Sequence, residues 1–68
     1  MPIYFTYILW SEITRHYYIG SCEDIQNRLS RHNRGAVRST KLGIPWTLIR
    51  TEEFKSRQDA YRRERQLK

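Results

Sequence analysis

The sequence has almost nothing from which to build a covalent or metal cross-link. Its single cysteine, Cys22, excludes an internal disulfide, and two histidines, His16 and His32, are too few for a finger-type zinc site. A lone cysteine is typical of a reducing compartment, and we expect a cytoplasmic protein. Because a chain of 68 residues buries a small share of its surface, its aromatic side chains must supply much of the core.

Long apolar runs are also absent. No stretch reaches the roughly 20 apolar residues that a membrane span needs. The apolar start at residues 3–10 lacks the basic segment and cleavage site of a signal peptide. Without repeats or linkers, residues 1–68 predict one domain. Its last helical pattern reaches Lys68 without a cap, so we expect either a naturally short chain or a functional protein that continues further.

Acidic residues are few. Asp and Glu number 7 against 13 Lys and Arg, which gives a net charge of +6. Only Arg15 precedes residue 28, so the other cations all lie between Arg28 and Lys68. This asymmetry favours a polyanionic partner. A solvated basic surface that serves solubility is the second interpretation, and composition leaves both open.

The strand patterns predict a small antiparallel sheet. Residues 3–10 are β-branched and aromatic throughout, which is typical of a central strand. Residues 16–20 predict a second strand, joined to the first by the polar turn at 11–15. A third strand follows at 46–53. Its inward side chains are either Trp46, Leu48 and Arg50 or the alternate set with Ile49.

Two helices complete the pattern. Capping side chains at residues 21–24 predict the start of the first helix, and Gly35 predicts its end. Residues 36–45 read as a loop. Ser56 opens a capping box before the last helix. The expected fold is therefore α+β, a three-stranded antiparallel sheet flanked by helices in the order β-β-α-β-α.

Glu64 is the first candidate for chemistry. It shares a helical stripe with Ala60 and Leu67, so its carboxylate is expected to face the sheet. Burying a carboxylate without a partner is costly. One partner is Mg²⁺ with water and phosphate oxygens. The other is a salt bridge to Arg28, Arg50 or a neighbouring arginine, which the helix pattern alone favours.

Arg28 and His32 lie four residues apart and therefore share one helical face. Arg suits a phosphate and His transfers protons near neutral pH. Tyr7 and Tyr18 fall in paired strands and are expected to face the same side. A phenol is a poor base unless cations or a metal lower its pKa, and Arg28 with a metal would do so. A solvated helix edge and ordinary strand aromatics remain the alternatives.

Gly20 and Cys22 lie between these groups. Gly20 ends the second strand and permits either close approach of a ligand or a turn. Cys22 has no base beside it in sequence, and we interpret it as a small filler at the helix start.

In this order the motifs resemble the GIY-YIG nuclease domain over nearly all of the chain. The first motif is Phe5-Thr6-Tyr7 and the second is Tyr18-Ile19-Gly20, which matches the YIG outright. The helix matches through residues 24–29 and His32-Asn33. Residues 46–54 and 60–64 resemble the small stand-alone bacterial members. The first motif departs from the pattern by lacking its glycine and isoleucine, and the chain ends before the supporting Asn that many members carry.

The resemblance implies a metal-dependent endonuclease that hydrolyses phosphodiester bonds in DNA. Tyr7 acts as, or helps to activate, the base that deprotonates the attacking water, and Tyr18 positions that water. Arg28 binds the scissile phosphate, and His32 supports the tyrosines or the phosphate. Glu64 is the single protein ligand of Mg²⁺ or Mn²⁺.

The resemblance also suggests DNA as the partner, with a role in DNA repair or against branched or foreign substrates. The protein is expected to be a monomer or a weak dimer. A non-catalytic nucleic-acid-binding module and a structural or interaction domain are the competing classes. The residues expected to contact nucleic acid are Gly20, Arg31, Arg34, Arg38 and Lys41.

Overall fold

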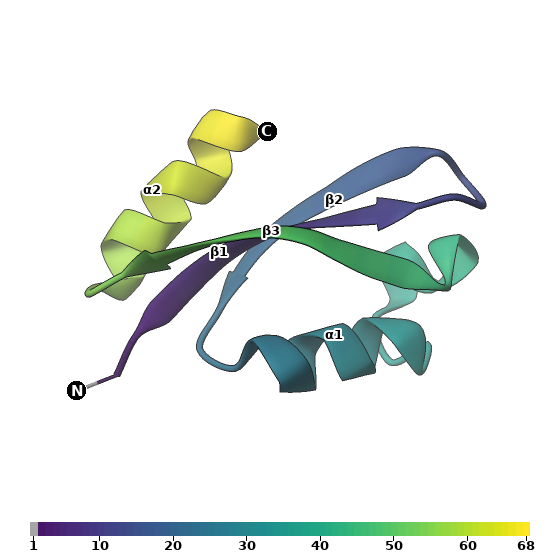
Figure 1. Cartoon of the computed structure of the whole chain (residues 1–68), viewed down its shortest axis with the longest axis horizontal. Coiled ribbons are helices and arrows are strands. Elements are labelled where there is room, and N and C mark those ends of the chain that lie inside the picture. The colour runs from purple at the N-terminus through teal and green to yellow at the C-terminus, as the bar shows by residue number, and fades with distance from the viewer. Residues whose placement is uncertain (1) are drawn as a thin grey trace.

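The computed structural model describes residues 2–68. The strands form one antiparallel sheet in the order β2-β1-β3, with α1 and α2 on opposite sides (Figure 1). This confirms the α+β fold and the central place of the first strand. No helix in the described part of the chain is long and apolar enough to cross a membrane. The elements are β1 (Tyr4–Ser11), β2 (His16–Cys22), α1 (Ile25–Asn33), the 3-10 helix η1 (Arg38–Gly43), β3 (Trp46–Phe54) and α2 (Arg57–Leu67).

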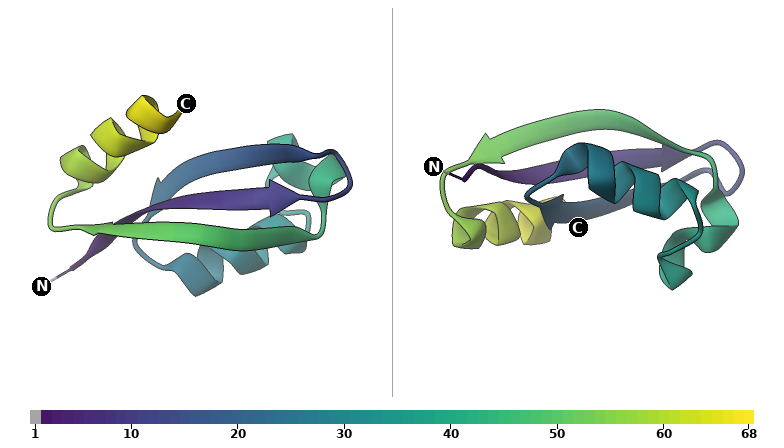
Figure 2. Two further views of the ribbon diagram at one scale, coloured as in Figure 1. Left: turned by 45° about the horizontal axis from the view of Figure 1, so that its top comes forward. Right: turned by 90° about the horizontal axis from the view of Figure 1, so that it is seen from below.

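Alternation along β1 separates two faces of the sheet, because successive side chains of a strand point to opposite sides. Tyr7 and Leu9 are almost fully buried on the side of α1, which Figure 2 shows lying along the sheet. The same core takes in Cys22 at the end of β2, and not at a helix start as predicted. Ile25 and Leu29 of α1, four residues apart and so on one helical face, cover it.

β3 contains a bulge at Ile49. Pairing with β1 passes from Ile8↔Arg50 to Leu9↔Leu48, so Ile49 has no partner opposite it. Trp46 and Leu48 do face the core as predicted. The inward placement of Arg50 is wrong, because the bulge turns the strand after Leu48 and leaves both Ile49 and Arg50 exposed.

Both predicted helix starts are confirmed by their caps. The Asp24 side chain accepts a hydrogen bond from the Asn27 amide at 3.0 Å, and Ser56 accepts one from the Asp59 amide at 3.1 Å. Gly35 follows α1 with a φ of 78°, the left-handed conformation that favours glycine. The predicted loop at 36–45 is only partly right, because η1 forms within it.

One buried hydrogen bond joins α2 to the sheet. The Thr6 hydroxyl donates to the Ala60 carbonyl at 2.8 Å, and both residues are at most 2% exposed. Near the same helix, Glu52 of β3 accepts from Arg63 at 2.8 Å. Because Glu64 follows Ala60 by about one helical turn, these contacts determine where its carboxylate lies.

We expect Thr6→Val to weaken the attachment of α2. The substitution keeps the shape of the side chain and removes the donor, so the free energy of unfolding should fall by about 1 kcal/mol. Urea denaturation followed by circular dichroism measures this change. Thr47→Val, on an exposed strand position, is the matched control and should leave the stability nearly unchanged.

Candidate active site

The ring of Tyr7 lies directly over Gly20, its cross-strand partner in β2. A Cβ atom at position 20 would lie 2.5 Å from Tyr7 Oη and 2.7 Å from its Cζ, closer than real contacts allow. The missing side chain of Gly20 therefore makes room for Tyr7. Contact of Gly20 with nucleic acid stays a prediction.

Tyr7, His32 and Thr40 form a buried hydrogen-bonded chain. Tyr7 Oη lies 3.1 Å from His32 Nε2, and His32 Nδ1 lies 2.8 Å from Thr40 Oγ1. The Thr40 hydroxyl donates to the Val37 carbonyl at 3.3 Å. Thr40 Oγ1 can then only accept from His32, so the proton of the neutral imidazole is on Nδ1. Nε2 is left as the acceptor for the Tyr7 hydroxyl.

Burial controls the protonation of this chain. It lowers the pKa of His32, and the positive charges of Arg28 and Arg31 lower it further. Burial likewise raises the pKa of Tyr7, with a contribution from Tyr18, and Arg28 only partly offsets this rise. Arg28 does lower the pKa of Tyr7, as expected, but burial raises this pKa by more. Tyr7 and His32 are therefore both neutral at pH 7 unless a bound cation lowers the pKa of the Tyr7 phenol.

Arg28 and Tyr18 complete the cluster on the α1 side. Tyr18 has its ring centroid 6.3 Å from that of Tyr7 and 4.8 Å from that of His32, so the two tyrosines do face the same side. Its hydroxyl makes no hydrogen bond within residues 2–68. Arg28 is near enough to influence the pKa of Tyr7, Cys22 and His32, yet it forms no salt bridge with any described residue. Its guanidinium is free to bind an anion.

Glu64 of α2 approaches β2, an edge strand of the sheet, from the face opposite α1. The Ser21 hydroxyl donates to its Oε1 at 2.8 Å, and the Lys68 ammonium donates to its Oε2 at 2.7 Å. None of the arginines considered from the sequence pairs with it in the described chain. The carboxylate raises the pKa of Lys68, and the Tyr18 phenol adds to this rise. Lys68 and Glu64 therefore lie on the α2 face of β2, opposite the face that carries Tyr18.

The donor set around Glu64 suits a hard divalent cation. The carboxylate is only 14% exposed and already faces one positive group, the Lys68 ammonium. Residues 2–68 hold no cluster of three or more His, Cys, Asp or Glu side chains. One carboxylate would leave most coordination positions to water and phosphate oxygens, which is the arrangement that Mg²⁺ prefers. The residues present therefore fit such an ion, which Glu64 would hold.

Salt bridges divide the cations into two groups. Many cations outside α1 and η1 are paired, as Arg57 is with Glu23 and Arg62 with Asp59. The cations of α1, η1 and the segment between them form no salt bridge within residues 2–68, and all but Arg28 are exposed. They thus form an open basic surface that begins at the cluster. These residues are Arg28, Arg31, Arg34, Arg38 and Lys41.

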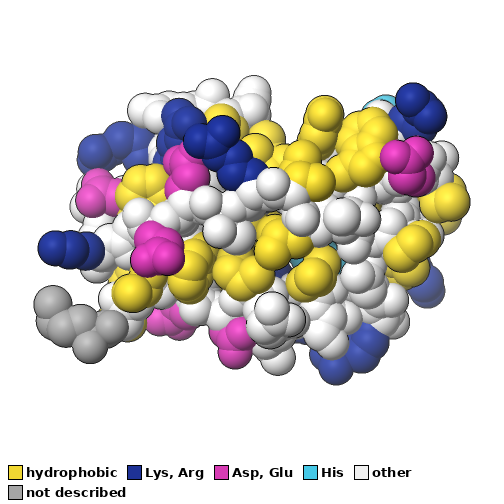
Figure 3. All heavy atoms as spheres, viewed as in Figure 1, with side chains coloured by type: hydrophobic (Ala, Val, Ile, Leu, Met, Phe, Trp, Pro, Cys, Tyr) yellow, Lys and Arg dark blue, Asp and Glu magenta, His cyan; other side chains and the backbone are white. Residues whose placement is uncertain are grey.

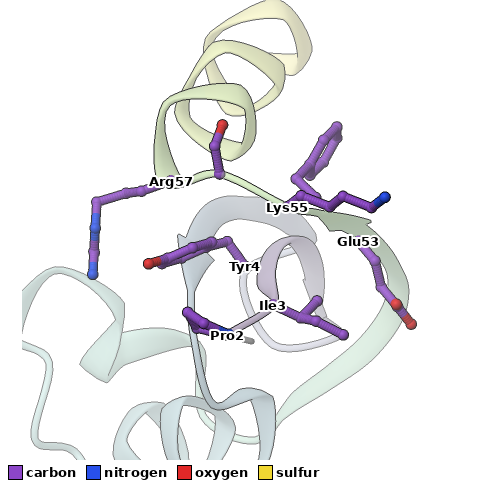
Figure 4. A pocket seen from close by; sticks show the side chains of 8 residues that line it. Pro2, Ile3, Tyr4, Glu53, Lys55 and Arg57 are labelled. Atoms are coloured by element: carbon purple, nitrogen blue, oxygen red, sulfur yellow. The ribbon is translucent and has the colours of Figure 1, made fainter.

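A wide hollow of the surface lies away from this cluster. It has a volume of about 710 Å³ and lies between the start of β1 and the turn from β3 into α2 (Figure 4). On its wall the Arg57 guanidinium lies 5.1 Å from the centre of the Tyr4 ring. None of the predicted site residues lines this hollow, so its volume is no evidence that the reaction takes place there.

Four supporting residues were not predicted from the sequence. Thr40 orients His32, while Ser21 and Lys68 hold Glu64. Asn33 clamps the start of β3, since its side chain accepts from the Trp46 amide at 2.6 Å and donates to the Trp46 carbonyl at 3.1 Å. Ser21 bonds to a residue 43 positions away, and Thr40 bonds to one eight positions away across the turn after α1, so no helix or strand spacing marks them. Only Lys68 had a signal, its spacing of four residues from Glu64.

Comparison with known proteins shows the family to which the chain is similar. The family model described as the GIY-YIG catalytic domain matches residues 3–68. A UPF0213 protein of Halobacterium salinarum is 42% identical over 53 residues, which cover 76% of this chain and 69% of the relative. No solved structure matches the chain.

The chain belongs to the GIY-YIG family. Proteins of this family are nucleases that act on nucleic acid. The family match confirms the resemblance that the two tyrosine motifs, the helical Arg-His pair and the late glutamate suggested.

Burial of neutral His32 should make stability depend on pH. The unfolded imidazole has a pKa near 6.5 and the folded one a lower pKa, so the unfolded state binds the proton more readily. Stability is then full above pH 6.5 and falls as the pH drops below it. Urea denaturation between pH 7.5 and pH 5.5 tests this. His32→Gln should flatten the dependence, and an unchanged slope in that variant would contradict the assignment.

Proposed function

We propose that this protein is a divalent-metal-dependent endonuclease that hydrolyses phosphodiester bonds in DNA. The observation that carries the proposal is the convergence of two groups on one edge strand. The neutral Tyr7–His32 pair lies on one side of β2, and the partly buried Glu64 lies on the other. Arg28, free of salt bridges within the described residues, lies beside the pair.

Arg28 is suited to hold the scissile phosphate. Its planar guanidinium binds two phosphate oxygens at once and stabilises the negative charge that grows on them. The open cations from Arg31 to Lys41 continue this positive potential along α1 and η1, where they would contact the flanking phosphates. A strand bound there places one phosphate next to Tyr7.

Tyr7 and His32 then deprotonate the attacking water as a relay. Water transfers a proton to Tyr7 Oη while the Tyr7 proton passes to His32 Nε2, so no free phenolate forms. The water oxygen bonds to phosphorus and the bond to the leaving oxygen breaks. His32 becomes an imidazolium whose Nδ1 proton remains bonded to Thr40. This route agrees with the raised pKa of Tyr7.

Tyr18 and Glu64 contribute position and charge. The Tyr18 hydroxyl, which bonds to no described residue, is available to orient the water. Glu64 would hold the metal, and Ser21 keeps the carboxylate in place. A bound Mg²⁺ or Mn²⁺ supplies positive charge that stabilises the leaving oxygen. The Lys68 ammonium, which bonds to Oε2, is the group that such an ion would replace at the carboxylate.

Substitutions at Tyr7 and Glu64 test the chemistry. Tyr7→Phe keeps the ring over Gly20 and removes only the hydroxyl, so cleavage of labelled duplex, flap and branched DNA should slow by about 10²- to 10⁴-fold. Glu64→Gln should abolish the dependence on Mg²⁺ or Mn²⁺ together with cleavage. Tyr61→Phe and Glu53→Gln, at exposed positions outside the cluster, are the matched controls. Unchanged cleavage by both active-site variants would refute the proposal.

The open basic surface makes a separate prediction about binding. Arg34→Gln with Arg38→Gln removes two unpaired cations, so the slope of log affinity against log salt for duplex DNA should fall by about 2. Arg57→Gln with Arg62→Gln removes two salt-bridged cations and is the control of equal charge. Binding titrations at several salt concentrations measure both slopes. Equal slopes for the two double variants would contradict a contact surface on α1 and η1.

A further inference from the structure

The face of the sheet away from α1 is apolar and partly uncovered. A groove of about 410 Å³ crosses it, a volume within the range of small-molecule sites. Figure 3 shows hydrophobic side chains gathered over the sheet between α2 and the tip of the β1–β2 hairpin, with cationic side chains at the border. We call this surface the outer groove; its lining residues are Ile8, Tyr17, Ile19, Ile49, Arg50 and Leu67.

Aromatic rings dominate one end of the outer groove. Tyr17 is 62% exposed, although it packs against its cross-strand partner Trp10 with ring centroids 4.7 Å apart. Trp10 is itself held in place by a hydrogen bond from its indole to Glu12 at 2.9 Å. A tyrosine supported in this way is a rigid, accessible π surface.

Position relates the outer groove to the proposed active site. Tyr17 and Tyr18 are consecutive residues of β2, which is an edge strand, so their rings lie on opposite faces of the sheet. Tyr18 belongs to the cluster with His32, while Tyr17 opens onto the outer groove. A single strand that passes over the edge of β2 can therefore reach both rings with neighbouring nucleotides.

We propose that the outer groove binds an unpaired base next to the cleaved phosphodiester, with Tyr17 as its stacking platform. This inference rests on the proposed nuclease function and narrows its substrate to DNA with unpaired nucleotides beside the cut. Base–aromatic stacking needs an exposed π face with apolar surroundings, and the phosphates need cations. Arg50 at the rim and Arg15 at the hairpin tip are the nearest cations; each forms an exposed salt bridge, to Glu52 and Glu12, which a phosphate would have to replace.

A second copy of the chain is the rival occupant of the outer groove. Association through this face would bring together two chains with a net charge of +6 each, which repel one another. A stable dimer also buries about 600 Å² or more on each partner. The charge of the whole protein therefore favours a polyanion over a copy of itself.

Binding measured in a chelator, without cleavage, tests this inference separately from catalysis. Fluorescence anisotropy with a labelled oligothymidylate and with a blunt duplex gives both affinities. Tyr17→Ala should weaken oligothymidylate binding about 5- to 100-fold and leave duplex binding unchanged. Tyr61→Ala, at a tyrosine that is 52% exposed on α2, is the matched control and should change neither affinity.

Two further variants separate stacking from folding and from hydrophobic contact. Tyr17→Phe retains the ring and should bind like the wild type, whereas Tyr17→Leu retains only apolar area and should bind like Tyr17→Ala. Circular dichroism confirms that each variant is folded.

Three results would overturn the inference. They are no oligothymidylate binding by the wild type, wild-type affinity in Tyr17→Leu, and a concentration-dependent dimer that Tyr17→Ala abolishes in sedimentation. Each leaves metal-dependent cleavage of the duplex, flap and branched substrates, and its loss in Glu64→Gln, as the independent measure of the proposed function.

Discussion

The contact between Tyr7 and Gly20 is the constraint on which the rest of the site depends. An aromatic ring in a central strand normally packs against the side chain opposite it, but Gly20 has none, and the ring lies across the backbone of β2. This carries the hydroxyl from the middle of the sheet to His32 on α1. Any side chain at position 20 would push the ring away and break the hydrogen-bonded chain that continues to Thr40.

Because Tyr7 projects over β2, this edge strand separates the site into two halves. Tyr18 and the α1 cluster lie on one face, while Ser21 directs Glu64 from α2 on the other. Each half is stabilised by its own helix, α1 through the apolar core and α2 through the buried bond from Thr6 to Ala60. A small domain can thus assemble a candidate site without a deep cavity, and the hollow beside Tyr4 lies away from it.

Local chemistry was enough to predict most of the fold and to select the side chains that the structure brings together around Tyr7. The caps at Asp24 and Ser56, the central strand and the helical pairing of Arg28 with His32 depend on neighbours within a few residues. The bulge at Ile49 and the bond from Ser21 to Glu64 depend on pairing between distant segments, and Thr40 reaches His32 only through the turn after α1. No spacing in the sequence encodes those contacts.

The direction of the Tyr7 pKa also follows only from the folded state. From the sequence, a nearby arginine indicates a phenol with a lowered pKa. In the structure, burial raises the pKa of Tyr7 by more than Arg28 lowers it. A neutral phenol cannot act as a base alone, but it can accept a proton while it gives one up. The lowered pKa of His32 keeps the imidazole unprotonated and ready to receive that proton. Burial disfavours the charged forms of Tyr7 and His32. It thereby suits the two neutral groups to pass a proton from one to the other.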